Sequence, residues 1–219
     1  MMTSSAGPPS RVTALYQAGA LALALLVLGA TAVLTADGIR SQQARAAEEP
    51  LRDLLNSARV SFDRLHPVSG TLPESSLLEI GDDEPAFVAF SDEEATAAIL
   101  PVVTNAGYGG RIRLRVALAR DGSVLAYSVQ SHRETTGLGD AIDPERSAWA
   151  TQFAGLSLEN VPASRWQPVA GGGEFEALTG ATISSRAVID ALQRALSYYA
   201  KHGQRLFMRD GPMEKVSDA

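Results

Sequence analysis

Residues 111–118 read Arg111-Ile112-Arg113-Leu114-Arg115-Val116-Ala117-Leu118 and alternate between apolar and mostly basic side chains. A period of two places the apolar side chains on one face of a β-strand and the arginines on the other. Asp121-Gly122 follows, a pair typical of a tight hairpin turn, and Val124–Val129 supplies an apolar returning strand. The stretch therefore predicts an antiparallel hairpin, whose arginine face we interpret as solvated.

Helical periodicity predicts two helices on either side of this hairpin in the sequence. The first covers residues 37–66 as a stalk that ends before Pro67, and its apolar positions are Leu51, Leu54, Leu55, Ala58, Phe62 and Leu65. The second runs from about Ser185 to Lys201, with Gly203 as its stop. Its buried stripe consists of Val188, Leu192, Leu196 and Tyr199.

The segments between these elements carry weaker signals. Residues 67–85 are rich in Pro, Ser, Gly and acidic residues and predict a surface loop. Residues 95–100 follow three acidic residues and predict a short helix or the start of a strand. Trp149–Phe153 predicts a short helix, and the glycines at 171–173 predict a flexible approach to the last helix. These elements together predict an α+β domain with an antiparallel sheet and flanking helices.

The N-terminal part of the chain predicts a membrane anchor. Residues 1–11 form a polar tail, and residues 12–36 contain no charged side chain. A helix over that run would be about 37 Å long, enough to cross a bilayer with some tilt. Ala30-Thr31-Ala32 leaves a cleaved signal peptide as the alternative. Arginines lie on both sides of the run, so charge does not decide its orientation.

Composition excludes several classes of function. The net charge is -6, and no basic stripe could neutralise a nucleic-acid backbone. The absence of cysteine excludes disulfides, thiolate catalysis and cysteine-ligated iron–sulfur clusters. The three histidines are scattered without the spacing of metal ligands. Redox chemistry in this chain would therefore need an organic cofactor.

Residues 179–185 directly precede the last predicted helix and read Thr179-Gly180-Ala181-Thr182-Ile183-Ser184-Ser185. The small residues at 180 and 181 let the backbone approach a bulky group, as glycine-rich phosphate loops do. Ser184 or Ser185 is expected to cap the helix, whose free N–H groups favour an anion. A phosphate on the Thr182 hydroxyl would meet these donors, with Arg186 nearby. The alternative is an ordinary capped helix start.

A second segment, residues 132–139, follows the hairpin. Gly137 and Gly139 bracket Leu138 in a loop that could press against a flat ring, while Glu134 and Thr135 could bond its polar edges. The alternative is a surface loop that closes the hairpin. His132 has no partner in the sequence that would make it catalytic.

Taken in order, five segments resemble the FMN-binding domain family, and in particular the G subunit of the Rnf (Rsx) electron transport complex. They are Gly107-Tyr108-Gly109-Gly110, Glu134-Thr135-x-Gly137-Leu138-Gly139, Trp149-x-x-x-Phe153-x-Gly155, Gly172-Gly173-x-Phe175 and Thr179-Gly180-Ala181-Thr182-x-Ser184. The resemblance implies FMN in phosphoester linkage to Thr182, attached by a flavin transferase that uses FAD and Mg²⁺. It also implies that the loop from Glu134 to Gly139 packs by the isoalloxazine ring.

The resemblance assigns a full set of cofactor-binding residues and no catalytic residue or metal ligand. The set comprises Thr179, Gly180, Ala181, Thr182, Ser184, Ser185, Glu134, Thr135, Gly137 and Leu138. Two positions depart from the family pattern. Glu176 stands where the family usually has Asp, and Thr136 where it usually has Pro. The extra methylene could change the grip of the transferase, and the missing proline would loosen the loop.

The resemblance further implies an electron-carrier subunit that does not turn over alone, in a redox-driven ion-translocating complex between ferredoxin and NAD. Its partners would be a soluble flavoprotein, an iron–sulfur protein, integral membrane subunits, the transferase and the lipid bilayer. The flavin domain would be periplasmic on the bacterial inner membrane. The expected boundaries are a tail at 1–11, the span at 12–36, the stalk at 37–66, the FMN-binding domain at 67–210 and a tail at 211–219.

Three other functions stay open at the sequence level. One is the C-type flavin subunit of the sodium-pumping NADH:quinone oxidoreductase, whose chains are typically longer. Another is a membrane-tethered flavin-binding regulatory domain, although such proteins usually carry extra spans or an iron–sulfur module. The last is an anchored interaction domain without a cofactor.

Overall fold

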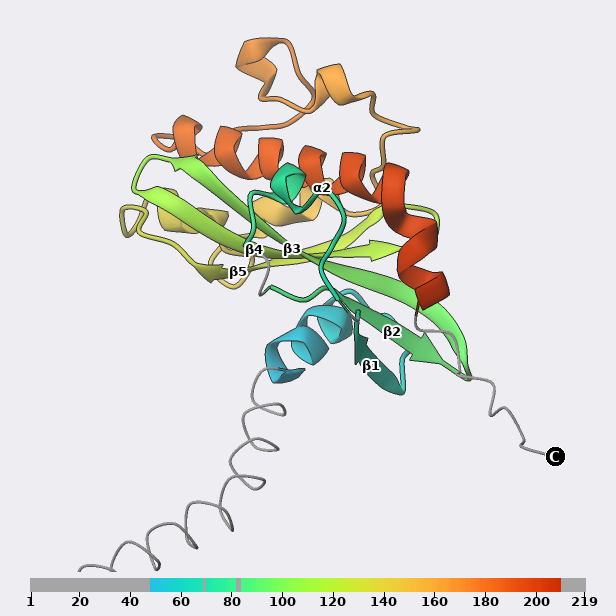
Figure 1. Cartoon of the computed structure of the whole chain (residues 1–219). Helices are drawn as coiled ribbons and strands as arrows, with labels where there is room; N and C mark the ends of the chain where they lie inside the picture. Colours follow the sequence, from blue (N-terminus) through green and yellow to red (C-terminus); the bar gives the residue numbers. More distant parts are fainter. Residues whose placement is uncertain (1–47, 69, 82–83, 210–219) are drawn as a thin grey trace, which may run out of the picture. The chain divides into compact units, whose positions relative to one another are not determined.

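A single antiparallel sheet in the order β1-β2-β3-β4-β5 forms the centre of the domain (Figure 1). The computed structural model describes residues 48–68, 70–81 and 84–209. The strands are β1 (Arg64–Pro67), β2 (Phe87–Ser91), β3 (Glu94–Gly107), β4 (Gly110–Ala119) and β5 (Val124–Ser131). Each strand pairs with the next along the chain, so the sheet is built from short local connections.

The hairpin predicted from the alternating stretch is confirmed as β4 and β5. Val116 lies opposite Tyr127, and Ala117 lies opposite Ala126. Gly122 adopts a φ of 84°, which a glycine tolerates without strain, and completes the turn. The Asp121 carboxylate accepts the N–H of Ser123 at 2.9 Å and its hydroxyl at 2.7 Å. These bonds hold the turn closed.

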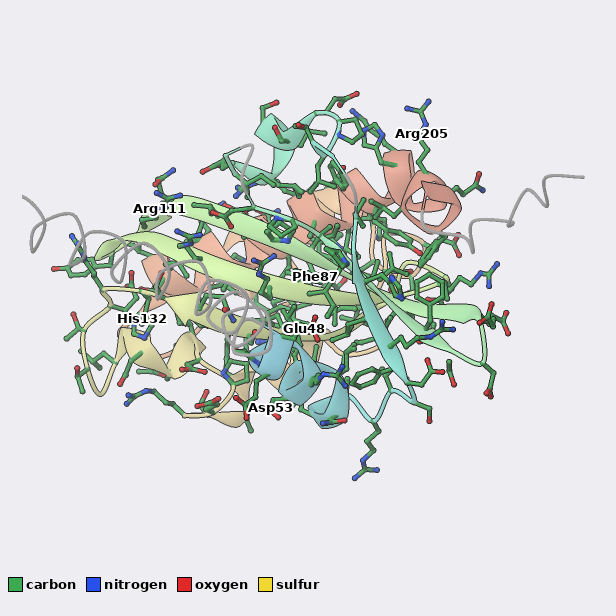
Figure 2. All side chains as sticks on the ribbon, turned by 60° about the horizontal axis from the view of Figure 1, so that its bottom comes forward. Glu48, Asp53, Phe87, Arg111, His132 and Arg205 are labelled. Atoms are coloured by element: carbon green, nitrogen blue, oxygen red, sulfur yellow. The ribbon has the colours of Figure 1, made fainter. Side chains whose placement is uncertain are left out.

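Helices cover both faces of the sheet, as the α+β prediction requires (Figure 1). The long helix α2 (Thr182–Arg209) packs on one face, where Leu114 and Val116 meet Val188 and Leu192 in the larger apolar core. The helix over residues 48–57 packs on the opposite face, where Leu55 meets Ile99 in a smaller core. Figure 2 looks onto this second face, with Asp53 on the near side of the helix.

The arginine face of β4 is only partly solvated. Arg111 is exposed, but Arg113 forms an ion pair with Glu84 at 2.6 Å. Arg115 donates to the carbonyl of Pro85 at 2.7 Å and lies over the ring of Phe87. Burial lowers the pKa of Arg115. The segment before β2 therefore covers a face that the alternation alone assigns to solvent.

The predicted stalk helix over residues 37–66 is wrong at its C-terminal end, because the described helix stops at residue 57. Arg59 adopts a left-handed φ of 56°. The N–H of Val60 donates to the carbonyl of Leu55 at 3.0 Å, and the N–H of Arg59 donates to the carbonyl of Asn56 at 2.9 Å. This is a Schellman stop formed without the glycine that usually signals one. Residues 37–47 of the prediction lie outside the described residues.

The longest strand, β3, is not predicted in full because it carries no alternating pattern. Residues 97–104 are all buried, since one helix covers each face of the sheet at this point. Pro101 also lies within the strand, opposite Arg115, and a proline in such a run argues against a central strand. The predicted loop over residues 67–85 contains the 3₁₀ helix η1 (Ser75–Leu78) and leads into β2.

The predicted bounds of the last helix are also corrected. Helix α2 begins at Thr182, three residues before Ser185, and continues through Gly203 to Arg209. A Cβ at position 203 would lie 2.9 Å from ring atoms of Tyr199, so this glycine makes room for the ring instead of ending the helix. The Tyr199 hydroxyl donates to the carbonyl of Arg120 at 2.9 Å.

The remaining described elements are four 3₁₀ helices in the connection between β5 and α2. They are η2 (Gly139–Ile142), η3 (Ala148–Phe153), η4 (Ala163–Arg165) and η5 (Val169–Gly171). The short helix predicted at Trp149–Phe153 is confirmed as η3. Within the described ranges, none of the helices has the length and apolar character needed to cross a membrane. The predicted span at 12–36 lies outside them.

Candidate functional site

Three segments that are far apart in the sequence meet at one end of the sheet. They are the turn between β3 and β4, the loop after β5, and the start of α2. Arg111 and His132 lie at this end of the molecule, and Arg205 near the end of α2 lies at the other (Figure 2). The segments enclose a cavity of about 540 Å³, lined by Tyr108, Glu134, Thr135, Leu138, Gly139, Gly180, Ala181, Thr182, Ile183 and Ser184.

The buried carboxylate of Glu134 joins the three segments. Only 7% of Glu134 is exposed, and its Oε1 accepts the N–H of Gly109 at 3.0 Å. Its Oε2 accepts the hydroxyl of Ser184 in the first turn of α2. A Cβ at Gly109 would overlap the carbonyl of Arg133, so glycine is required for this close approach. Glu134 thus lines the cavity and also holds its walls together.

The loop from Thr135 to Asp140 is folded on itself and turns Leu138 outward. The carbonyl of Thr135 accepts the N–H groups of Leu138 at 3.2 Å and Gly139 at 2.9 Å. Gly137 adopts a φ of 80°, and its N–H bonds to the carboxylate of Asp140 at 2.8 Å. Asp140 is buried and also pairs with Arg146 at 3.1 Å. Asp140 therefore stabilises the folded loop through its bond to the N–H of Gly137, although no sequence pattern assigned it to the site.

Thr182 is exposed at the first position of α2 and opens into the cavity. The turn before it closes with a bond from the N–H of Ala181 to the carbonyl of Leu178 at 3.0 Å. Gly180 supplies the positive φ, 80°, that this turn needs. The helix therefore starts at the residue that carries the free hydroxyl. Its first turn contains no acidic side chain, so its N–H groups and dipole favour an anion there.

The predicted caps at Ser184 and Ser185 are wrong. Both serines lie inside the first turn of α2. Ser184 donates to Glu134, as described above. The Ser185 hydroxyl accepts the N–H of Leu178 at 2.9 Å and donates to the carbonyl of Ala181 at 3.0 Å. The two serines therefore fix the position of the helix start relative to the loops around it.

The cavity wall contains most of the predicted site residues. Those that line it are Glu134, Thr135, Leu138, Gly180, Ala181, Thr182 and Ser184, and those that do not are Thr179, Ser185 and Gly137. His132 has a structural contact, because its Nδ1 accepts the N–H of Glu134 at 3.1 Å. In the described part of the chain, no cluster of His, Cys, Asp or Glu could hold a metal ion.

Large apolar side chains are exposed around the cavity. Tyr108 is 72% exposed, Ile183 55% and Leu138 48%, and among the described residues the only other large apolar side chain this exposed is Val169. A cluster of exposed apolar side chains is typical of a binding site. The predicted set of site residues does not include Tyr108 or Ile183. The only local signal for Tyr108 is an aromatic residue between glycines, at 107 and 109–110.

Comparison with known proteins gives a family match that contains the whole cavity. The FMN-binding domain family matches residues 107–197, a range that contains every residue lining the cavity. Three relatives are each named as the G subunit of an ion-translocating oxidoreductase complex. The one from Shewanella oneidensis is 33% identical over 84% of this chain and 88% of its own length. The one from Vibrio vulnificus is 34% identical over 80% of this chain and 82% of its own length. The one from Shewanella loihica is 36% identical over 65% of this chain and 68% of its own length.

The identity extends over most of both chains, and the matched FMN-binding domain contains the cavity together with β4, β5 and the first part of α2. Agreement on that scale resolves the choice that the sequence patterns left open between a flavin domain and an interaction domain without a cofactor. The chain therefore belongs to the family of G subunits of the ion-translocating oxidoreductase complex, and its described domain contains the FMN-binding domain of that family.

Proposed function

We propose that the chain is the electron-carrier subunit of a membrane-bound, ion-translocating oxidoreductase and that it holds FMN in phosphoester linkage to Thr182. One observation carries the proposal. The exposed hydroxyl residue Thr182 stands at a helix start and opens into a cavity rimmed by exposed apolar side chains. The relatives are named as G subunits, which favours this function over that of the C-type flavin subunit.

The cavity suits the chemistry of FMN. A volume of about 540 Å³ lies within the range of cofactor sites. Tyr108, Leu138 and Ile183 offer apolar surface to the faces of a planar ring. The exposed Thr135 and the main chain of the loop offer groups for polar ring edges. The volume and the side chains that line the cavity therefore fit the chemistry of a flavin.

The start of α2 suits the phosphate. Thr182 supplies the oxygen of the ester, and the free N–H groups of the first turn supply donors to the remaining phosphate oxygens. Arg186 is exposed one turn further along and adds positive charge on the same helix. A covalent ester removes dissociation, so the cavity can stay open on one side for electron exchange. FMN supplies the redox chemistry, and the chain supplies position and electrostatics.

The wider assignment follows from the same family. We infer an inner-membrane protein with the span at 12–36, a periplasmic flavin domain, and electron transfer between ferredoxin and NAD within the complex. Other subunits of the complex would receive the open side of the cavity. A flavin transferase would load FMN during maturation. The subunit would act only as part of the complex.

The test is in-gel fluorescence after expression with a flavin transferase and denaturation. The wild-type chain should fluoresce, Thr182→Ala should not, and Thr71→Ala should fluoresce like the wild type. Thr71 is a matched control because it is an exposed threonine that does not line the cavity. Fluorescence that survives in Thr182→Ala would place the linkage elsewhere. An intact mass equal to the bare wild-type chain would exclude covalent FMN altogether.

A further inference from the structure

Arg111 and Arg133 lie at neighbouring positions at the end of the sheet that carries the cavity. Arg113 on β4 pairs with Ser131 on β5, so continuing both segments by two residues brings Arg111 next to Arg133. The close approach of the Arg133 carbonyl to Gly109 keeps the two segments together beyond the last paired residues. Arg111 is labelled at this end of the molecule in Figure 2.

Neither of these two arginines has a carboxylate partner. Both are exposed, and the side chain of neither makes an ion pair or hydrogen bond with any residue that the structure describes. The next two arginines on the same face of β4 are occupied. Arg113 pairs with Glu84 at 2.6 Å, and Arg115 donates to the carbonyl of Pro85 at 2.7 Å. The cavity end of the sheet therefore presents two cations that the described fold does not neutralise.

The placement of two like charges next to each other costs stability. Like charges at adjacent positions of two antiparallel strands repel one another, and the repulsion is smallest when an anion lies close to both. The chain as a whole is acidic, with a net charge of -6, yet none of its described carboxylates fills this place. An anionic group from outside the chain would remove the repulsion.

The two arginines border an apolar surface. Tyr108, three residues before Arg111, is exposed, and so are Leu138 and Ile183 on the wall of the cavity. Protein–protein interfaces are enriched in aromatic residues and arginine, with apolar side chains at the centre and charged side chains toward the rim. The mouth of the cavity and its border therefore have the composition of a surface that receives another protein.

We propose that Arg111 and Arg133 form the electrostatic border of the surface that docks the electron-exchange partner, and that this partner presents acidic side chains there. This inference rests on the proposed function and adds the charge of the partner's surface. A protein fits better than an anionic lipid surface, because lipid-binding segments typically gather about four to eight basic residues. Docking forms no covalent bond, and the two arginines act only on approach and orientation.

The experiment measures how fast the chain binds the rest of its complex. The full chain, loaded with FMN and held in detergent, is passed over immobilised complex purified without this subunit, at low and high ionic strength. Arg111→Gln/Arg133→Gln removes both charges, and Arg111→Glu/Arg133→Glu reverses them. Arg205→Gln is the matched control. Arg205 is likewise exposed, has no ion pair with a described residue, and lies at the other end of the molecule (Figure 2).

At low ionic strength, the neutral double variant should lower the association rate constant about tenfold, and the reversed variant should lower it further. The dissociation rate constant should change little, because charges at the rim of an interface act mainly on association. At high ionic strength the wild type and both double variants should converge, since exposed charges are screened. Arg205→Gln should match the wild type throughout.

Stability and lipid binding provide two further readouts. The neutral double variant should unfold at the same temperature as the wild type or above it, because the repulsion is gone. A clearly less stable variant would overturn the inference, since the arginines would then serve the fold. Vesicles that contain phosphatidylglycerol test the lipid surface. Weaker vesicle binding by the neutral variant, with unchanged binding to the complex, would assign the arginines to the membrane and also overturn the inference.

The outcomes separate this inference from the proposed function. A wild-type chain that accepts no covalent flavin would refute the proposed function itself. A loaded wild type whose double variants bind the complex at the same rate at every ionic strength would overturn the inference and leave the proposed function intact.

Discussion

Glu134 and Ser184 are 50 residues apart in the chain and share a buried hydrogen bond. The bond joins the loop after β5 to the first turn of α2, on which Thr182 stands two residues before Ser184. The other oxygen of Glu134 accepts the N–H of Gly109, so the same carboxylate also bonds to the turn between β3 and β4. The walls of the cavity are therefore coupled, and a change at one is expected to move the others.

Ser184→Ala should destabilise the fold. The variant leaves one oxygen of the buried Glu134 carboxylate without its donor, which costs about 1–3 kcal/mol in the free energy of unfolding. Urea unfolding of the described domain measures the change. Ser164→Ala, on the exposed η4, is the control and should stay within about 0.5 kcal/mol of the wild type. Equal stabilities for the two variants would show that the buried bond contributes nothing.

Gly109→Ala should disrupt the same network from the other side. The added Cβ would overlap the carbonyl of Arg133, so the backbone must shift away from Glu134. We expect a loss of about 1–3 kcal/mol, as for other overpacked sites. Gly81→Ala is the control, because a Cβ there meets nothing within 4 Å. Denaturation midpoints of both variants against the wild type decide whether the close approach at Gly109 is required.

Leu138→Ala should change the flavin environment and leave stability nearly unchanged. Leu138 is 48% exposed, so its truncation removes little buried surface from the protein without cofactor. In the protein loaded with FMN, the truncation should expose the flavin ring, so iodide should quench flavin fluorescence more strongly than in the wild type. Val169→Ala alters a similarly exposed side chain that does not line the cavity and should leave quenching as in the wild type. Identical quenching in both would remove Leu138 from the ring contact.

Asp190→Asn should stabilise the protein at neutral pH. Burial raises the pKa of Asp190 on α2 above its ordinary 3.8, and the opposing influence of Arg186 and Arg194 is smaller. The folded state therefore prefers the protonated side chain, and the stability that this provides is complete below 3.8 and lost as pH rises through the raised pKa. The asparagine variant should exceed the wild type at neutral pH and lose its advantage in acid. Urea unfolding at both pH values checks this.

Asp121→Asn should show the opposite dependence. Hydrogen bonds from Ser123 lower the pKa of Asp121 below its ordinary 3.8, so the charged form stabilises the hairpin turn. That contribution is present above 3.8 and lost as pH falls through the lowered pKa. The variant should be less stable than the wild type at neutral pH and similar to it in acid. A difference that did not depend on pH would mean that charge has no part in the turn.

Local patterns were sufficient where an element has one solvated face or a residue with a strong turn preference. The hairpin of β4 and β5 follows from alternation and Asp121-Gly122, and the buried stripe of α2 follows from its helical period. The same patterns failed where both faces of a strand are buried, and where the end of a helix depends on the φ angle of one residue. The strand β3 lacks alternation because both of its faces are covered, and the first helix ends at a left-handed Arg59 that nothing in the sequence marks.

The sequence by itself determined the family and placed Thr182 close to the start of the last helix, because the motifs and the helical period each depend on residues close together in the chain. Only the tertiary structure decided which of those residues form one cavity. It placed Tyr108 and Ile183 on the rim, assigned Ser184 to the Glu134 bond instead of a cap, and fixed the main chain of Glu176 through Gln152. These relations join segments that are at least 24 residues apart, and such contacts exist only once the sheet and α2 have packed.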